Sequence, residues 1–253
     1  NYTFNNGNYA YRREEGRPMG SFYGYRYKGV YQNKDATYAR DADGNVMRDI
    51  SGNAIVMRNG NAAVAPGDAI YEDINHDGVI NQYDIVYLGN SNPRFTGGAG
   101  INISYKQFKL SAIFYGRYGQ DVVNSTRLNN ESMRGIDNQS TAVLRRWRNE
   151  GDQTDIPRAL YGEGYNTLGS DRFVEDASYL RLKSLSFTYR LPKKAIQRWG
   201  FNNIDVYVTG YNLLTWTKYT GQDPEVKTEN TYARDSATTP ASIQLVAGFN
   251  LSF

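Results

Sequence analysis

Hydrophobic and polar residues alternate along six segments of the chain, most clearly over residues 242–253. In that segment one set of alternate positions is entirely apolar and the other is mostly polar. The apolar set consists of Ile243, Leu245, Ala247, Phe249, Leu251 and Phe253. Because successive side chains of a strand point to opposite faces of a sheet, the segment is predicted to be a β-strand with one apolar face. That face fits contact with lipid, and the alternative is the half-buried strand of a soluble sheet.

Five other segments carry the same alternation. They are residues 21–31, 99–106, 108–114, 184–191 and 204–209, of which the first is aromatic and interrupted by glycines. Short and long connections alternate between the segments, and the long ones are residues 32–95, 118–177 and 215–241. Outer-membrane barrels have short turns on one side and long loops on the extracellular side. We therefore expect an all-β fold, an antiparallel transmembrane β-barrel segment whose three long connections are extracellular loops.

Six strands do not close a membrane barrel, because the smallest usual barrels have about eight. The chain is therefore interpreted as part of a larger barrel, or as a sheet that another chain completes. Composition excludes a helical membrane protein, since apolar runs such as residues 112–115 reach four residues and a spanning helix needs about 20. The 22 tyrosines suit side chains that lie partly in lipid and partly in water.

Residue types that common catalytic sites require are scarce. The sequence has no cysteine, and its single histidine, His76, lies within a loop of metal-binding type. A histidine-based triad, a zinc site or a thiol nucleophile therefore has nothing to build on. A net charge of +3 and one basic run, Arg145-Arg146-Trp147-Arg148, are too little to indicate nucleic-acid binding. The sequence predicts a protein that is not an enzyme and does not bind nucleic acid.

Residues 73–84 match the spacing of an EF-hand-type calcium loop, with a glycine at the sixth position for the sharp turn. The predicted ligands are Asp73, Asn75, Asp77, Val79 through its backbone carbonyl, Asn81 and Asp84. Calcium takes about six to eight oxygen ligands, so we expect Ca²⁺ as a structural cofactor that pins this loop. The alternative is a turn in which Asp and Asn side chains cap their own backbone and no metal binds.

Several segments match a known family in the family's own order. They are residues 16–25 (GRPMGSFYGY), Gly67-Asp68 ahead of the calcium-type loop, Arg146-Trp147, residues 178–183 (SYLRLK) with 189–192 (YRLP), residues 212–225 (NLLTWTKYTGQDPE) and residues 248–253 (GFNLSF). In these segments the chain resembles the SusC/RagA group of TonB-dependent outer-membrane transporters. Residues 212–225 are the most specific, and the resemblance covers about residues 16–253.

The resemblance implies a 22-stranded barrel of which residues 1–253 are the C-terminal part, with the N-terminal plug domain absent from this chain. It also implies a location in the outer membrane of a Gram-negative bacterium and contact with outer-membrane lipid. The implied function is active import of glycans or peptides with a SusD-like surface lipoprotein. Energy would come from the TonB complex through the missing N-terminal part, and a homodimer of transporter–lipoprotein pairs is expected.

The sequence also singles out individual residues. A terminal aromatic on an alternating strand, here Phe253, resembles the signal by which outer-membrane barrels are recognised for assembly. Tyr161, Tyr165 and Trp216 are candidates for substrate contact, with packing or interfacial aromatics as the alternative. Two other functions stay open on the sequence alone: a stand-alone small outer-membrane porin or anchor barrel, and a secreted calcium-binding β-sandwich adhesin.

Overall fold

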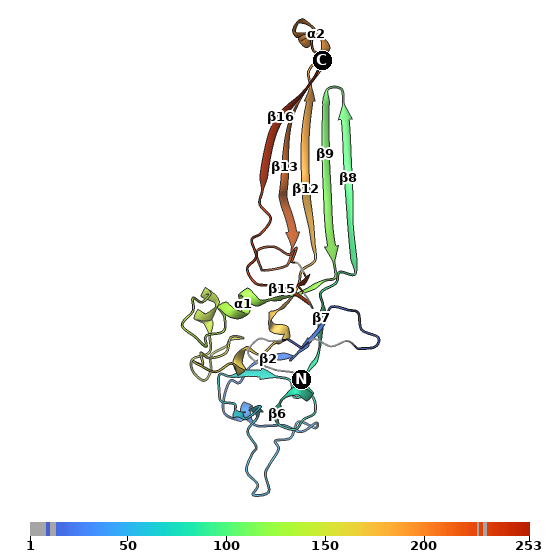
Figure 1. Ribbon diagram of the computed structural model, residues 1–253. Helices are drawn as coiled ribbons and strands as arrows, with labels where there is room; N and C mark the ends of the chain where they lie inside the picture. Colours follow the sequence, from blue (N-terminus) through green and yellow to red (C-terminus); the bar gives the residue numbers. More distant parts are fainter. Residues whose placement is uncertain (1–8, 11–13, 227, 230–231) are drawn as a thin grey trace. The chain divides into compact units, whose positions relative to one another are not determined.

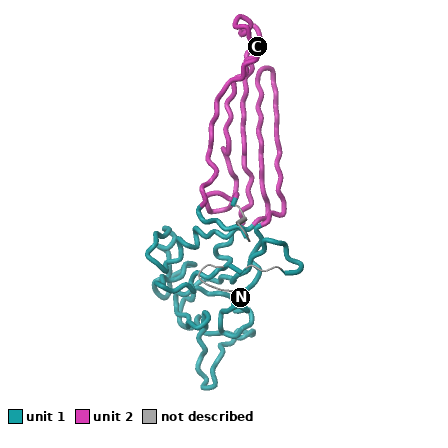
Figure 2. The backbone as a smooth tube through the Cα atoms, viewed as in Figure 1, with its two compact units in different colours: residues 1–91, 121–175, 226–237 teal, residues 92–120, 176–225, 238–253 magenta. Residues whose placement is uncertain are grey.

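The computed structural model describes residues 9–10, 14–226, 228–229 and 232–253, and the fold is all-β as predicted. The chain divides into two compact units, each assembled from three separate stretches of sequence (Figure 2). The loop unit comprises residues 1–91, 121–175 and 226–237, and the sheet unit comprises residues 92–120, 176–225 and 238–253. Across the described residues, no helix is both long and apolar enough to cross a membrane.

The sheet unit is one five-stranded antiparallel sheet with the strand order β16-β13-β12-β9-β8 (Figure 1). Its strands are β8 (Phe95–Tyr105), β9 (Phe108–Tyr118), β12 (Tyr179–Arg190), β13 (Asn203–Thr217) and β16 (Gln244–Ser252). A tight turn joins β8 to β9, and α2 (Lys193–Ile196) with η6 (Gln197–Trp199) lies between β12 and β13. These strands confirm five of the six alternating segments.

β8, β9, β12 and β13 are all longer than the alternation predicts, and in β12 and β13 a local irregularity interrupts the pattern. In β12 the register shifts between Leu182 and Ser184, so one extra residue puts the alternation out of phase and hides the first third of the strand. In β13 the residue Asn212 has a positive φ of 52° next to two consecutive leucines, which breaks the pattern after Gly210. Both strands continue through these irregularities.

The loop unit contains several short strands. β1 (Ser21–Gly24) pairs with β7 (Val86–Asn90), and β2 (Tyr27–Val30) pairs with β5 (Ala69–Tyr71). β3 (Arg58–Asn59) lies between β4 (Ala62–Ala63) and β6 (Val79–Ile80). A further small sheet is formed by β10 (Asp121–Asn124), β11 (Val174–Asp176), β14 (Thr228–Glu229) and β15 (Tyr232–Asp235). The helical turns are η1 (Asp35–Thr37), η2 (Gln82–Asp84), α1 (Ser125–Asn130), η3 (Thr141–Arg145), η4 (Tyr165–Thr167) and η5 (Asp171–Phe173).

The sixth predicted strand, residues 21–31, is wrong as a member of the large sheet. It forms β1 and β2, two short strands with different partners in the loop unit. Between them Tyr25 donates its backbone N–H to the carbonyl of Gly169 at 2.9 Å. A side chain at Gly24 would place its Cβ 2.3 Å from that same carbonyl oxygen. The glycine interruption therefore reflects a close approach of two backbones rather than a weak strand.

The core of the loop unit is rich in tyrosine. Tyr25, Tyr31 and Tyr71 are 2–4% exposed and pack with Met57 and Ile80 in one hydrophobic cluster. The buried Tyr71 hydroxyl accepts a hydrogen bond from the backbone N–H of Leu168, and burial raises the pKa of Tyr71 well above its usual value. The three rings supply a large apolar area, and the polar tip of Tyr71 finds its partner inside the unit.

Candidate functional site

One face of the large sheet is continuously apolar. Each residue of the row Ile103, Leu110, Phe187, Val208 and Ala247 is paired directly with the next across the five strands. The first four of these side chains are 38–55% exposed. A contiguous apolar surface of this kind marks contact with lipid or with another protein. The sheet therefore has one face that is suited to contact with lipid or with another protein.

The opposite face of the sheet is polar and hydrogen-bonded across strands. Ser111 Oγ donates to Asn102 Oδ1 at 2.5 Å, and Thr209 Oγ1 donates to Ser186 Oγ at 2.8 Å. Cross-strand pairs of this type stabilise a sheet while keeping its surface hydrophilic. The two faces together give the sheet an apolar side and a water-compatible side, which is the arrangement that the alternation predicts.

A buried arginine organises the polar side of β12. The Arg181 side chain is 3% exposed, and its guanidinium donates to the carboxylates of both Asp223 and Glu225. Its Nε donates to Thr215 Oγ1 at 2.9 Å, and Lys183 Nζ lies 2.9 Å from Glu225 Oε2. A guanidinium with every edge paired is the geometry in which a buried charge is tolerated. These ion pairs tie Asp223 and Glu225, which follow β13 in the sequence, to side chains of β12.

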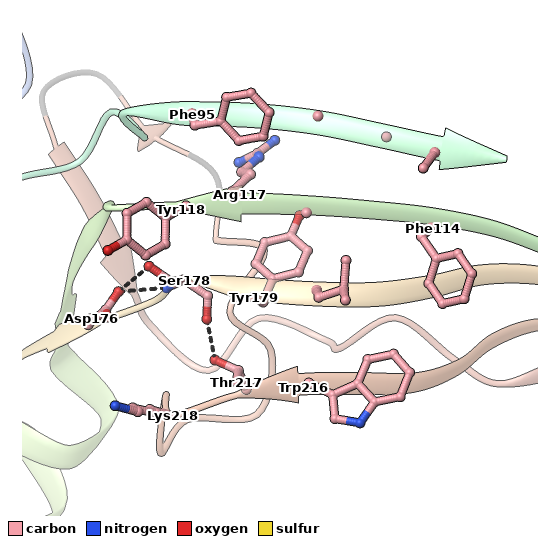
Figure 3. A pocket seen from close by; sticks show the side chains of 15 residues that line it. Phe95, Phe114, Arg117, Tyr118, Asp176, Ser178, Tyr179, Trp216, Thr217 and Lys218 are labelled. Carbon is pink, nitrogen blue, oxygen red and sulfur yellow. Dashed lines mark hydrogen bonds between the residues drawn. The ribbon is translucent and has the colours of Figure 1, made fainter.

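Two glycines leave a hollow in the apolar face near one end of β8, β9 and β12 (Figure 3). Gly97 and Gly116 face each other across β8 and β9, and Leu180 pairs with Gly116 on the other side. A cavity of about 850 Å³ lies here, and its aromatic lining is Phe95, Phe114, Tyr118, Tyr179 and Trp216. The ring of Phe95 reaches over Gly97, where a Cβ would lie 2.8 Å from it. Aromatic rings therefore border this part of the sheet.

The predicted calcium loop folds as a compact turn closed by its own side chains. The Asp73 carboxylate accepts from the backbone N–H of Gly78 at 2.8 Å. The Asp84 carboxylate is fully buried and accepts from the N–H groups of Ile74 and Asn81 at 2.9 and 2.8 Å. Burial, and then the nearby charges of Asp73 and Asp77, raise the pKa of Asp84.

The donor chemistry of this loop, oxygen atoms only, fits calcium. Within the described part of the chain, however, no three acidic or histidine side chains converge closely enough to hold a metal ion. The carboxylates of Asp73 and Asp84 accept from backbone amides in the manner of capped turns. The calcium site thus stays a prediction.

Comparison with known proteins identifies the family. No protein-family model matches the chain. It is 34% identical over 221 residues to TonB-dependent receptor P3 of Formosa agariphila, covering 85% of this chain and 19% of that protein. Receptor P26 of the same organism is 36% identical over 159 residues, covering 63% of this chain. The structure of the RagAB peptide transporter superposes with a TM-score of 0.67 at 26% identity, over 93% of this chain and 24% of that chain.

The chain belongs to the SusC/RagA family of TonB-dependent transporters. It spans 16–26% of the length of the curated relatives that it matches, so it corresponds to about a fifth of such a protein. The relatives are named as receptors and the solved structures as a transporter or importer.

In this SusC/RagA-family chain, the Gly67-Asp68 motif joins two distant stretches of the loop unit, because it contacts residues of 147–166. The buried Asp68 accepts from Arg158 Nε at 2.7 Å and from Asn166 Nδ2 at 3.1 Å. Gly67 has a φ of +87°, and a Cβ there would lie 2.3 Å from Cε3 of Trp147. Two separate parts of the family pattern, Gly67-Asp68 and Arg146-Trp147, therefore meet at one point, which sequence spacing alone does not reveal.

The aromatic candidates for substrate contact occupy different surroundings. Tyr161 is 77% exposed, whereas Tyr165 is half-buried in η4 and interacts with Arg158. Trp216 pairs with Leu180 in the sheet and lines the hollow in the apolar face, which favours the alternative of an interfacial aromatic. The ring of Phe253 packs 4.8 Å from that of Phe201, and its role in barrel assembly stays a prediction.

Proposed function

We propose that the chain forms part of the barrel wall and loops of an outer-membrane transporter that imports nutrients, glycans or peptides, in a TonB-dependent manner. The observation that carries the proposal is the five-stranded sheet with one exposed apolar face and one hydrogen-bonded polar face. In a membrane barrel the apolar face meets lipid and the polar face meets the lumen. The names of the family relatives support active transport over the alternatives of a small porin or an adhesin.

We further propose that the transporter works with a SusD-like surface lipoprotein, as a pair that dimerises, and that the TonB complex contacts a part outside this chain. The two-component name of the RagAB peptide transporter supports a partner protein. The loop unit is the part of the chain available for it, because it contains most of the three segments predicted to be extracellular. These proposals place the protein in the outer membrane of a Gram-negative bacterium.

A matched pair of arginine substitutions tests this function. Leu110 and Ser111 are neighbours in β9, and their side chains belong to the apolar and polar faces respectively. Leu110→Arg is expected to cost about 2–4 kcal/mol if its site lies near the bilayer midplane, whereas Ser111→Arg meets the lumen. In the full transporter, Leu110→Arg should lower the amount in the outer membrane, the co-purified lipoprotein and nutrient uptake. Equal behaviour of the two variants would contradict a lipid-facing sheet.

Calcium binding to residues 73–84 is a second proposal. A cation would offset the unfavourable burial of the Asp84 carboxylate beside Asp73 and Asp77. We expect Ca²⁺ to bind the full transporter with a calorimetric signal and a higher unfolding temperature, and Asp77→Ala to abolish both. Asp43→Ala is the control, because Asp43 also precedes a turn glycine on an exposed loop. A wild-type protein that gives neither signal would remove the site and leave a self-capped turn.

A further inference from the structure

The short connections of the sheet unit carry an excess of positive charge. Residues 99–114, 184–209 and 244–253 form the part of the sheet next to these connections, and they contain six of the 29 basic residues in the chain and one of the 26 acidic residues. The acidic residue, Asp205, is already paired with Arg190. Four other basic residues lie on the connections and are exposed. We call them the basic end of the sheet: Lys106, Lys193, Lys194 and Arg198.

We propose that the basic end binds the phosphate of an anionic phospholipid in the membrane leaflet around it. The inference rests on the proposed membrane location of the sheet and assigns a lipid-specific site to it. Figure 1 shows α2, the C-terminus and the turn between β8 and β9 at one end of the sheet. In outer-membrane barrels the short turns face the periplasm, so the leaflet at this end is the periplasmic one.

Backbone hydrogen bonds hold the connection between β12 and β13 against the sheet. Leu191 donates its backbone N–H to the carbonyl of Ile204 at 2.9 Å, and Asn202 donates to the carbonyl of Ser252 at 2.7 Å. Ile196 in α2 is 1% exposed, so the helix is also anchored between these two points. The basic side chains of α2 and η6 are therefore presented from a fixed position on the sheet.

A row of mostly aromatic residues lies between the apolar face and the basic end. Each residue of the row Tyr105, Phe108, Tyr189, Val206 and Phe249 is paired directly with the next across the five strands. The ring centroids of Phe108 and Tyr189 are 4.9 Å apart. In membrane barrels such aromatic girdles lie at the boundary between the hydrocarbon and the headgroups. The basic end, which follows this row in the chain, is therefore at the depth of the lipid phosphates.

The charge of the basic end has no counterpart in the described part of the chain. There, Lys193, Lys194 and Arg198 form no ion pair. Phosphate oxygens accept charge-assisted hydrogen bonds from lysine and arginine, and basic residues next to a membrane surface attract anionic lipids. A zwitterionic lipid carries its own cation beside the phosphate, so an anionic lipid complements these three side chains better.

Exposed rings beside the basic residues favour a lipid over a free anion. Trp199 directly follows Arg198 and is 64% exposed, and Phe253 is 82% exposed. Aromatic side chains are favourable at the level of the headgroups, where one part of the ring meets lipid and another meets water. A phosphate ion in solution would engage the cations and leave both rings in water. A phospholipid engages the cations and the rings together.

Site-specific photo-crosslinking tests this inference in the full transporter. Gln197, which is exposed and adjoins Arg198, is replaced by p-benzoylphenylalanine. The protein is reconstituted in vesicles of equal parts dioleoylphosphatidylglycerol and dioleoylphosphatidylcholine, and the lipid attached at position 197 is identified by mass spectrometry. Each basic residue near an anionic surface contributes a factor of about five in affinity, so we expect phosphatidylglycerol to exceed phosphatidylcholine at least about tenfold.

Two triple variants with the same loss of charge locate the effect. Lys193→Gln, Lys194→Gln and Arg198→Gln together should reduce the lipid ratio at position 197 to about one, because the phosphate loses its cationic partners. The control removes three other exposed basic residues and should keep the excess of phosphatidylglycerol: Lys34→Gln, Arg145→Gln and Lys218→Gln. Equal unfolding temperatures of the two variants are expected, since all six side chains are exposed.

Four results would overturn the inference. They are no lipid attached at position 197, no excess of phosphatidylglycerol in the unaltered protein, the same excess in both triple variants, and an excess that inorganic phosphate abolishes but sodium chloride of equal ionic strength does not. The last result would indicate a site for a free anion. The transport function is judged separately by Leu110→Arg and Ser111→Arg. If these two variants differ as expected while the crosslinking fails, the lipid site alone is wrong.

Discussion

Replacing Arg181 with methionine should destabilise the protein by about 3 kcal/mol, toward the lower end of the range for breaking a buried ion pair. The guanidinium is 3% exposed and pairs with two carboxylates, Asp223 and Glu225, whose side chains are 15% and 28% exposed. Without the arginine Asp223 loses its cationic partner, and Glu225 keeps only Lys183, which lies 2.9 Å away. Hydrogen exchange over residues 218–225 should accelerate, and the unfolding temperature of the full transporter should fall.

The control for this prediction is the second arginine of the same strand. Arg190 is 60% exposed and pairs with Asp205, so Arg190→Met should cost at most about 1 kcal/mol. Its exchange over residues 218–225 should match that of the unaltered protein. An equal loss of unfolding free energy in the two variants would mean that the buried ion pairs of Arg181 stabilise the protein no more than the exposed pair of Arg190.

The second large effect is expected from Gly67→Ala in the loop unit. The φ of +87° disfavours any residue with a Cβ, at about 1 kcal/mol, and the new methyl group would collide with Trp147. Overpacking of this kind costs about 1–3 kcal/mol more. Displacement of Trp147 should also disturb the neighbouring Asp68–Arg158 pair. Faster hydrogen exchange in peptides that contain residues 65–71 and 156–168 is the measurement.

Gly44→Ala is the matched comparison for Gly67→Ala. Its φ of +85° is nearly the same, but nothing lies within 4 Å of a Cβ built there. This variant should therefore show the backbone cost of about 1 kcal/mol alone. A Gly67→Ala protein that is no less stable than Gly44→Ala would show that Trp147 moves aside without cost.

Alternation was sufficient to predict the large sheet because each long strand keeps one face apolar over many residues. The predicted segment began late in β12 and ended early in β13, because the bulge near Lys183 and the positive φ of Asn212 interrupt the period of two. The short strands of the loop unit were not predicted, for a different reason. Strands of two to five residues, such as β6 and β7, are too short to carry a detectable period.

Tyrosine illustrates where composition misleads. A high tyrosine content predicts rings at the lipid–water boundary, but Tyr23, Tyr25, Tyr31 and Tyr71 are 1–4% exposed within the loop unit. These residues build a core for loops that have few long aliphatic side chains. The segments that contain Arg181 and Asp223 match the family pattern in the sequence. Their ion pair, however, depends on the tertiary path of residues 218–225, which the sequence does not reveal.

The sheet order has a consequence for handling the chain by itself. Strands β8 and β16 lie at the two ends of the sheet, and over the described residues each is paired along one side only. β8 is 11 residues long and β16 is nine, and about every second residue of each presents its backbone N–H and C=O groups along the outer border. Such long, straight borders recruit other strands readily. Expressed alone, this polypeptide should self-associate through β8 and β16. It should become monodisperse only when other strands of the barrel pair with both of these edge strands.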